Sequence, residues 1–156
     1  MAHEKINGCV VVKDLHYSVE DNTWAKVNDD GTVTIGMTDV AQSLAGPILH
    51  AKAKGVGTAR KKGRPIATVE SGKWVGPVKS PIAGEIVALN EGLASDAQLI
   101  NRSPYKDGWV VKMKPDSLEA DLAAMTTGDA AVAAYKEKIE RDNISCSHIE
   151  GTDEYE

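Results

Sequence analysis

Residues 67–86, ATVESGKWVGPVKSPIAGEI, decide the interpretation of this chain. Two β-rich runs, 64–71 and 78–90, flank a turn-like segment that contains Lys73. Runs rich in β-branched residues, bounded by glycine and proline, are typical of strands that meet at a turn. We therefore predict a β-hairpin with Lys73 near its tip. A lysine in such a place is either a solvated charge or a target for acylation.

The length and composition are those of one globular domain. The chain has 156 residues, of which 42% are hydrophobic and 26% are charged, enough for a sizeable core. Its formal net charge of −5 argues against a nucleic-acid partner whose phosphates are neutralised by the protein. We find neither a secretory signal nor a span of membrane length, so we expect a cytoplasmic protein without a membrane partner.

The two cysteines, Cys9 and Cys146, lie near opposite ends of the chain. Reduced thiols are the default for a cytoplasmic protein, and pairing of the two is an alternative that the sequence leaves open. Cys146 and His148 have no third metal ligand nearby in the sequence, so we predict no metal site. The sequence shows no nucleophile elbow and no carboxylate pair at a recognisable spacing. We therefore predict that the chain is not an enzyme.

The hydrophobic periodicity predicts a mainly β protein with a few helices. Strands are expected over 32–37, 47–51 and 109–115, with a short helix capped by Thr38 and ended by Gly46. Two helical runs follow near the C-terminus, the first with Asp116 and Glu119 in a capping-box spacing. The octamers LAGPILHA (44–51) and IAGEIVAL (82–89) share a pattern that suggests two related halves.

The motif around Lys73 resembles the lipoyl-attachment motif of the lipoyl/biotinyl domain family. Residues 70–73 read ESGK, and residues 78–84 read VKSPIAG. The likeness continues in NTWAKV (22–27), DGTVTIGMTDVAQSLAG (30–46) and LINRSPYKDGWVVKMKP (99–115), which are similar to segments of glycine-cleavage H proteins. It covers residues 15–116, most of the expected domain.

This resemblance implies a barrel-sandwich hybrid of β-sheets with C-terminal helices, and lipoic acid attached covalently to Lys73. Glu70 and Gly84 match the positions at which lipoyl-attaching enzymes read the hairpin, and Ser71 and Gly72 are expected to set the turn. Gly84 would also allow close backbone approach. Trp74, next to the lysine, is a candidate anchor for a partner protein.

With this resemblance, the chain is expected to have three parts. We expect an H-protein-like lipoyl domain over 1–116, a helical segment packed on it over 117–142, and a loosely ordered acidic tail over 143–156. The implied partners are a lipoate-protein ligase or lipoyl synthesis machinery, and lipoamide dehydrogenase.

Some residues depart from the family pattern, and they bear on which group the lipoyl arm carries. Gly72 and Trp74 flank the lysine, and Asn22 stands where a histidine is usual. These features are similar to the lipoate-binding proteins of bacterial sulfur oxidation. The resemblance then implies an arm that carries a sulfur-containing intermediate or electrons for a heterodisulfide-reductase-like complex.

Two alternatives stay open. The first is an H protein of the glycine cleavage system, which carries an aminomethyl group between decarboxylase, aminomethyltransferase and lipoamide dehydrogenase. The second is an unmodified binding or regulatory module. Biotin is disfavoured, because Gly72 and Trp74 occupy the places of the methionines in the biotinyl motif.

Overall fold

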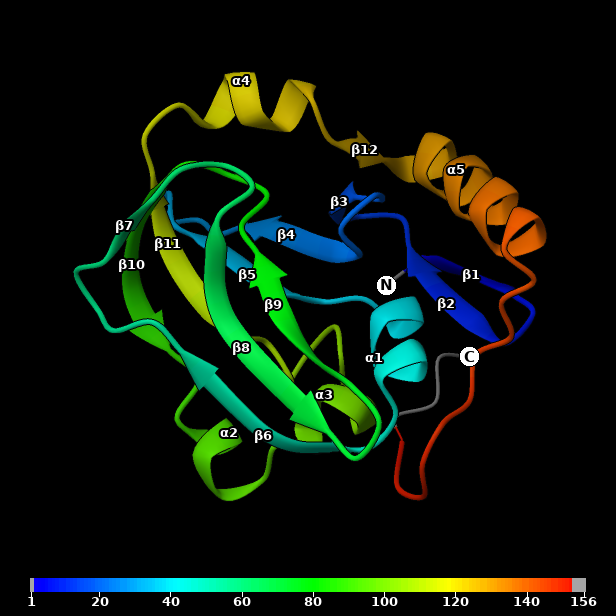
Figure 1. Cartoon of the computed structure of the whole chain (residues 1–156). Helices are drawn as coiled ribbons and strands as arrows, with labels where there is room; N and C mark the ends of the chain where they lie inside the picture. The colour runs from blue at the N-terminus through cyan, green and yellow to red at the C-terminus, as the bar shows by residue number, and fades with distance from the viewer. Residues whose placement is uncertain (1, 153–156) are drawn as a thin grey trace.

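Two packed antiparallel sheets form the body of the protein (Figure 1). The structure is a computed structural model that describes residues 2–152. The larger sheet has seven strands in the spatial order β12 (Thr126–Thr127), β3 (His16–Ser18), β4 (Thr23–Val27), β5 (Val33–Met37), β11 (Val111–Pro115), β10 (Gly84–Leu89) and β7 (Ala59–Arg60). The smaller sheet has the order β6 (Ile48–Ala53), β8 (Pro65–Ser71) and β9 (Val75–Lys79). The two related octamers end in different sheets, in β6 and β10.

The main core lies between these sheets. Ile35 and Met113 of the larger sheet belong to the same buried cluster as Ile66 and Val69 of the smaller one. Because side chains alternate across each strand, one face of every strand can enter this core while the other meets solvent. The prediction of a mainly β fold with a few helices is confirmed.

A separate hairpin and the helices complete the fold. The hairpin pairs β1 (His3–Ile6) with β2 (Cys9–Val12). The helices are α1 (Asp39–Ala45), α2 (Gly92–Ser95), α3 (Leu99–Arg102), α4 (Leu118–Ala123) and α5 (Gly128–Arg141). A second buried cluster joins the hairpin to α5 through side chains that include Val11, Tyr17, Tyr135 and Ile139. In Figure 1, α5 lies beside this hairpin.

The short helix expected after the first strands is confirmed as α1. Thr38 has extended backbone, and its hydroxyl accepts a hydrogen bond from the Ala41 amide at 3.2 Å. Gly46 ends the helix with a φ of 80°, a conformation that favours glycine. The expected capping box at Asp116 is wrong: α4 begins at Leu118, and its N-cap Ser117 makes no side-chain capping bond.

The predicted hairpin is correct in kind and wrong in its second strand. The strand that pairs with β8 is β9, which begins at Val75, while the run from Ser80 to Leu89 turns into the other sheet as β10. Pro77 lies within β9, opposite Thr68. Because β9 is an edge strand, a residue without an amide hydrogen is tolerated there.

A disulfide joins Cys9 of β2 to Cys146, with the Cα atoms 5.0 Å apart and 137 positions between them in the sequence. The default expectation of reduced thiols is therefore wrong in this structure. The sequence also predicts a loosely ordered tail over 143–156. Residues 144–149 are instead held by this disulfide and by hydrogen bonds to α1, and residues 153–156 lie outside the described part of the chain.

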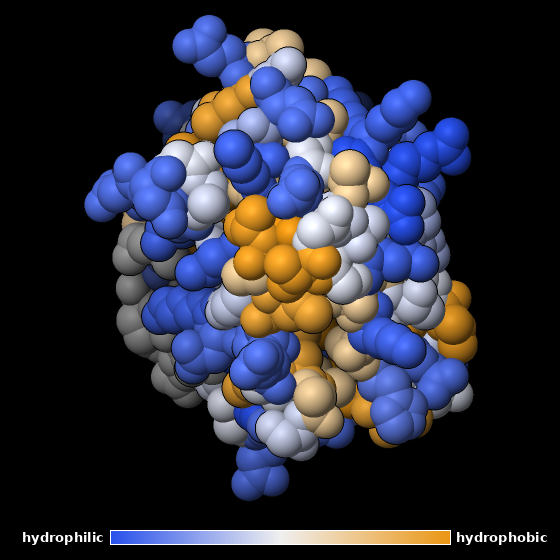
Figure 2. All heavy atoms as spheres, turned by 90° about the vertical axis from the view of Figure 1, so that its left-hand side faces the viewer, coloured by the Kyte–Doolittle hydropathy of each residue, from blue (hydrophilic) through white to orange (hydrophobic). Residues whose placement is uncertain are grey.

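The surface is polar with local apolar areas. On the face that carries β7 and β10, apolar atoms gather in the centre and hydrophilic side chains surround them (Figure 2). None of the helices within residues 2–152 has the length and apolar character needed to cross a bilayer.

Candidate functional site

Lys73 lies in the tight turn between β8 and β9. The Ser71 amide donates a hydrogen bond to the Trp74 carbonyl at 2.8 Å, so Gly72 and Lys73 form the tip of the hairpin. Lys73 is exposed, and its side chain lies over Gly46 at the end of α1. A Cβ atom on Gly46 would come within 2.9 Å of Lys73 Cε, so the absence of a side chain at Gly46 makes room for the lysine stem.

Buried polar groups fix this turn against α1. The Ser71 hydroxyl donates to the Ala45 carbonyl at 2.5 Å. Asn101 of α3 donates to the Gly46 carbonyl at 2.9 Å and accepts from the Ile48 amide at 2.9 Å. These bonds join the C-terminal end of α1, the start of β6 and the hairpin. The lysine therefore projects from a rigid base, as a reactive group presented to other proteins requires.

An apolar cleft of about 220 Å³ opens on the Trp74 side of the turn. Its apolar walls come from Met37, Ala41, Leu44, Ala45, Pro77 and Val78. Trp74 is 37% exposed at this cleft, and its indole covers the Cα of Gly76, where a Cβ would come within 2.3 Å of the ring. The absence of a side chain at Gly76 thus makes room for the indole against β9.

Polar residues also line this cleft. Asp21, Asn22 and Thr23 line it, and the buried Thr23 hydroxyl oxygen has no hydrogen-bond partner within the described chain. Asn22 accepts a hydrogen bond from Lys138 Nζ of α5 at 3.0 Å, and burial lowers the pKa of that lysine below its usual value. The mainly apolar lining of the cleft fits an aliphatic chain.

The remaining residues expected at the site are placed differently. Glu70 is exposed on the outer face of the small sheet, with its carboxylate 4.0 Å from His50 Nε2. Gly72 has no atom within 4 Å of its would-be Cβ, and its φ is not left-handed, so the turn does not require glycine there.

Gly84 lies beyond the far end of β9 from Lys73. A Cβ on Gly84 would come within 2.3 Å of the Lys114 carbonyl oxygen in β11. The close backbone approach expected at Gly84 is therefore present in the sheet, away from the lysine.

Several residues beside Lys73 carry no motif that identifies them in the sequence. Gly46, Asn101, Ser147 and His148 line a second cavity together with Lys73, with a volume of about 300 Å³. Only Gly46 has a local signal, because it follows a capped helix and precedes Pro47. Within residues 2–152, no group of three or more histidine, cysteine or acidic side chains is placed to hold a metal ion.

An exposed lysine at a hairpin tip, on a sandwich of two sheets, is the arrangement of the lipoyl-carrier class. The model of the family described as "Glycine cleavage H-protein" matches residues 15–138. This chain therefore belongs to the glycine cleavage H-protein family, whose members carry lipoate covalently on a lysine and are carrier proteins, not enzymes.

Individual relatives agree with this assignment. Glycine cleavage system H protein 2 of Aquifex aeolicus is 50% identical over 143 residues, which cover 92% of this chain and 89% of that protein. Probable glycine cleavage system H protein 2 of Saccharolobus solfataricus is 39% identical, with 92% and 97% covered. The crystal structure of a glycine cleavage system H protein from Mycobacterium marinum has the same fold, with a TM-score of 0.67, 24% identity, and coverage of 86% of this chain and all of that one.

Proposed function

We propose that Lys73 bears the lipoyl group and that the protein carries an aminomethyl group for a glycine cleavage system. The observation that supports the attachment point is the position of Lys73, exposed at the tip of a turn whose neighbours are fixed by buried hydrogen bonds. The names of the relatives favour this cargo. The partners would be the decarboxylase, the aminomethyltransferase and lipoamide dehydrogenase, in the cytoplasm.

The residues around Lys73 would position the arm. When bound, lipoamide supplies a dithiol that takes up a fragment or an electron pair at one active site and releases it at another. Acylation removes the charge of the Lys73 amine, so the arm can lie over apolar side chains at a lower desolvation cost. The cleft beside Trp74 offers such a surface.

Attachment is tested with a lysine pair from the same hairpin. The full chain is produced with a lipoate-protein ligase and lipoate, and its intact mass is measured. We expect one lipoyl increment in the wild type and in Lys79→Arg, whose lysine lies at the other end of β9, and none in Lys73→Arg. An increment that persists in Lys73→Arg, or an unmodified wild type, would contradict the proposal; the second result would favour the unmodified binding module.

The cargo is tested with the lipoylated chain and glycine decarboxylase. Exchange of bicarbonate with the glycine carboxyl group requires only these two proteins, so it isolates the first transfer from the later steps. We expect exchange that depends on Lys73. Lipoylated protein that supports none would contradict the glycine cleavage assignment.

A second candidate is a sulfur carrier that works with a heterodisulfide-reductase-like complex. The exposed Trp74 indole at the mouth of the cleft favours it, because this large ring changes the surface that a partner meets beside the arm. In this case glycine exchange is absent, and thiol-bound sulfur offered as a persulfide appears as an added sulfur mass on the reduced arm.

Trp74→Ala separates partner contact from lipoyl attachment. Since the indole lies on Gly76 and lines the cleft, its loss is expected to weaken turnover with the partner by about tenfold, roughly the effect of one good apolar contact. Lipoylation should persist in this variant. Loss of the lipoyl increment instead would assign Trp74 to recognition by the ligase.

A further inference from the structure

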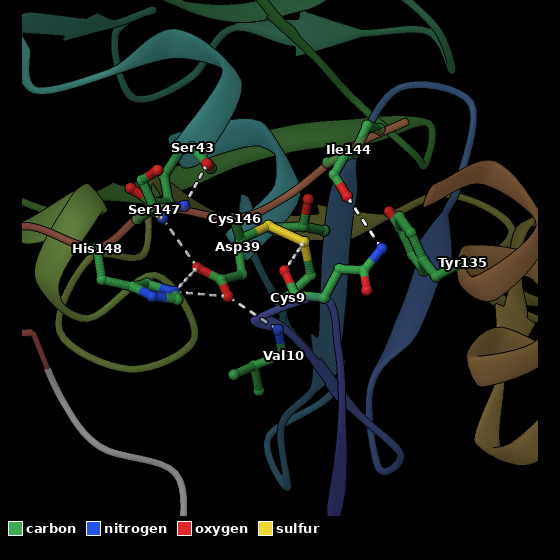
Figure 3. Close-up of a disulfide and its surroundings, with 12 residues drawn as sticks. Cys9, Val10, Asp39, Ser43, Tyr135, Ile144, Cys146, Ser147 and His148 are labelled. Carbon is green, nitrogen blue, oxygen red and sulfur yellow. Dashed lines mark hydrogen bonds and ion pairs between the residues drawn. A yellow bond between two sulfur atoms is a disulfide. The ribbon is translucent and has the colours of Figure 1, made fainter. Parts of the chain in front are cut away.

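The two cysteines of the Cys9–Cys146 disulfide differ in burial. Cys9 is completely buried in β2, whereas Cys146 is partly exposed. Cys146 belongs to residues 144–149, which we name the C-terminal strap. Figure 3 shows the disulfide with Asp39 and Ser147 beside it. Of the two residues, Cys146 is therefore the one in contact with solvent.

The C-terminal strap runs from the disulfide along α1, the helix that ends beside Lys73. The Ser147 amide donates to the Ser43 hydroxyl at 2.8 Å, and Gln42 donates to the Ser147 carbonyl at 3.0 Å. His148 Nε2 lies 2.8 Å from the carboxylate of the buried Asp39 (Figure 3). These contacts fix the strap along α1.

The strap and the lysine share a cavity. Ser147, which follows Cys146 directly, lines the cavity of about 300 Å³ that Lys73 and Gly46 also line. Lys73 and the residue that follows the partly exposed Cys146 therefore border the same space. A flexible chain attached to Lys73 would start beside this cavity, and Cys146 directly precedes Ser147, which also lines it.

We propose that Cys9 and Cys146 form a second redox couple of this carrier, which exchanges with the dithiol of the lipoyl group on Lys73. This inference rests on the proposed attachment at Lys73. A dithiol tethered within reach of a disulfide has a high effective concentration. Exchange within one molecule is therefore faster than exchange between molecules. Thiol–disulfide exchange is the ordinary reaction of these two groups.

The exchange balances without another reactant. A thiolate of the reduced arm attacks Cys146 Sγ, the Cys9–Cys146 bond breaks, and Cys9 leaves as a thiolate that takes up the released proton. The second arm thiol then attacks the mixed disulfide, and Cys146 leaves as a thiol while the dithiolane closes. The arm loses two electrons and two protons, and the cysteine pair gains them. The Asn7 carbonyl, 4.0 Å from Cys9 Sγ, can accept a weak hydrogen bond from the new thiol.

The test counts cysteine thiols in the full lipoylated chain. Lipoamide dehydrogenase in catalytic amount and excess NADH reduce the arm without any added small thiol. Samples are quenched with an alkylating reagent, and the peptides containing Cys9, Cys146 and Lys73 are analysed by mass spectrometry. We expect alkylation of the arm followed by alkylation of both cysteines, with a first-order rate that does not change when the protein is diluted tenfold.

The matched control is Lys73→Arg, which keeps the charge but cannot carry the arm, supplied with free lipoamide at the same concentration. Its cysteines should react at least tenfold more slowly. The proposal is overturned if the arm is alkylated while the disulfide stays intact, if the rate rises with protein concentration, or if Lys73→Arg reacts as fast as the wild type. Failure of the proposed attachment gives a different result, because no lipoyl mass and no arm thiols are then found.

Discussion

Substitution of Gly84 separates a requirement of the sheet from a requirement of the lipoyl-attaching enzyme. Gly84 is paired with Pro115 of β11 on one side and with Arg60 of β7 on the other. A Cβ would come within 2.3 Å of the Lys114 carbonyl oxygen, a backbone atom that cannot move aside alone. The strands must separate by about 1 Å, and overpacking of this kind costs about 3 kcal/mol.

The assay is urea and thermal unfolding of Gly84→Ala, monitored by fluorescence and circular dichroism. A loss of about 3 kcal/mol lowers the melting temperature by about 6–12 °C in a domain of this size. The matched control is Gly72→Ala, whose Cβ meets open space without a left-handed φ, so its stability should stay within about 0.5 kcal/mol of the wild type or rise.

Lipoylation is measured on the folded fraction of both variants. If Gly84 acts through the sheet, folded Gly84→Ala accepts the lipoyl group as the wild type does. A Gly84→Ala protein of unchanged stability would refute the argument from close approach. A stable but unmodified one would return Gly84 to direct recognition by the enzyme.

Three further predictions concern the N-terminal strands and α5. Thr23→Val removes a buried hydroxyl without a described partner and should raise the free energy of unfolding by about 1 kcal/mol; a loss in urea unfolding would show that the hydroxyl is bonded. Burial lowers the pKa of His16 below its usual 6.5, so the unfolded chain binds the extra proton and stability falls as the pH drops below about 6.5. His16→Gln should flatten this dependence in thermal melts between pH 7 and about 5, and an unchanged slope would exclude His16 as its source. Lys138→Met loses the hydrogen bonds to the Val19 carbonyl at 2.6 Å and to Asn22, and should cost about 1 kcal/mol; the exposed Lys136→Met on the same helix is the control, and equal stability of the two variants would contradict the argument.

Local signals predicted the elements that local physics determines. The Thr38 cap and the Gly46 stop give α1 because both act within one turn of the helix. The hairpin at Lys73 was also predictable, although its second strand was not, because GPV reads as a turn. Pro77 is compatible with β9 only since that strand lies at the sheet edge, which is a property of the assembled sheet.

Long-range contacts around the lysine could not be predicted in this way. Asn101 reaches the end of α1 across 55 positions, and its sequence context resembles any short polar loop. Cys146 meets Cys9 because α5 packs on the N-terminal hairpin and returns the chain to its start. Both contacts join residues far apart in the sequence, where no local sequence pattern can reveal them. The environment of Lys73 therefore depends on the tertiary fold.

The bond between Cys9 and Cys146 also makes the chain a closed covalent ring that contains both sheets and Lys73. A single cut in an exposed turn of this ring, such as the one at Asn28–Thr32, leaves one covalently continuous molecule with new ends. A force applied to the chain on either side of the ring would pass through the sulfur bridge, and the two large sheets would bear no load until that bridge is reduced. Mechanical resistance and tolerance of backbone nicks are therefore set in this protein by its redox state.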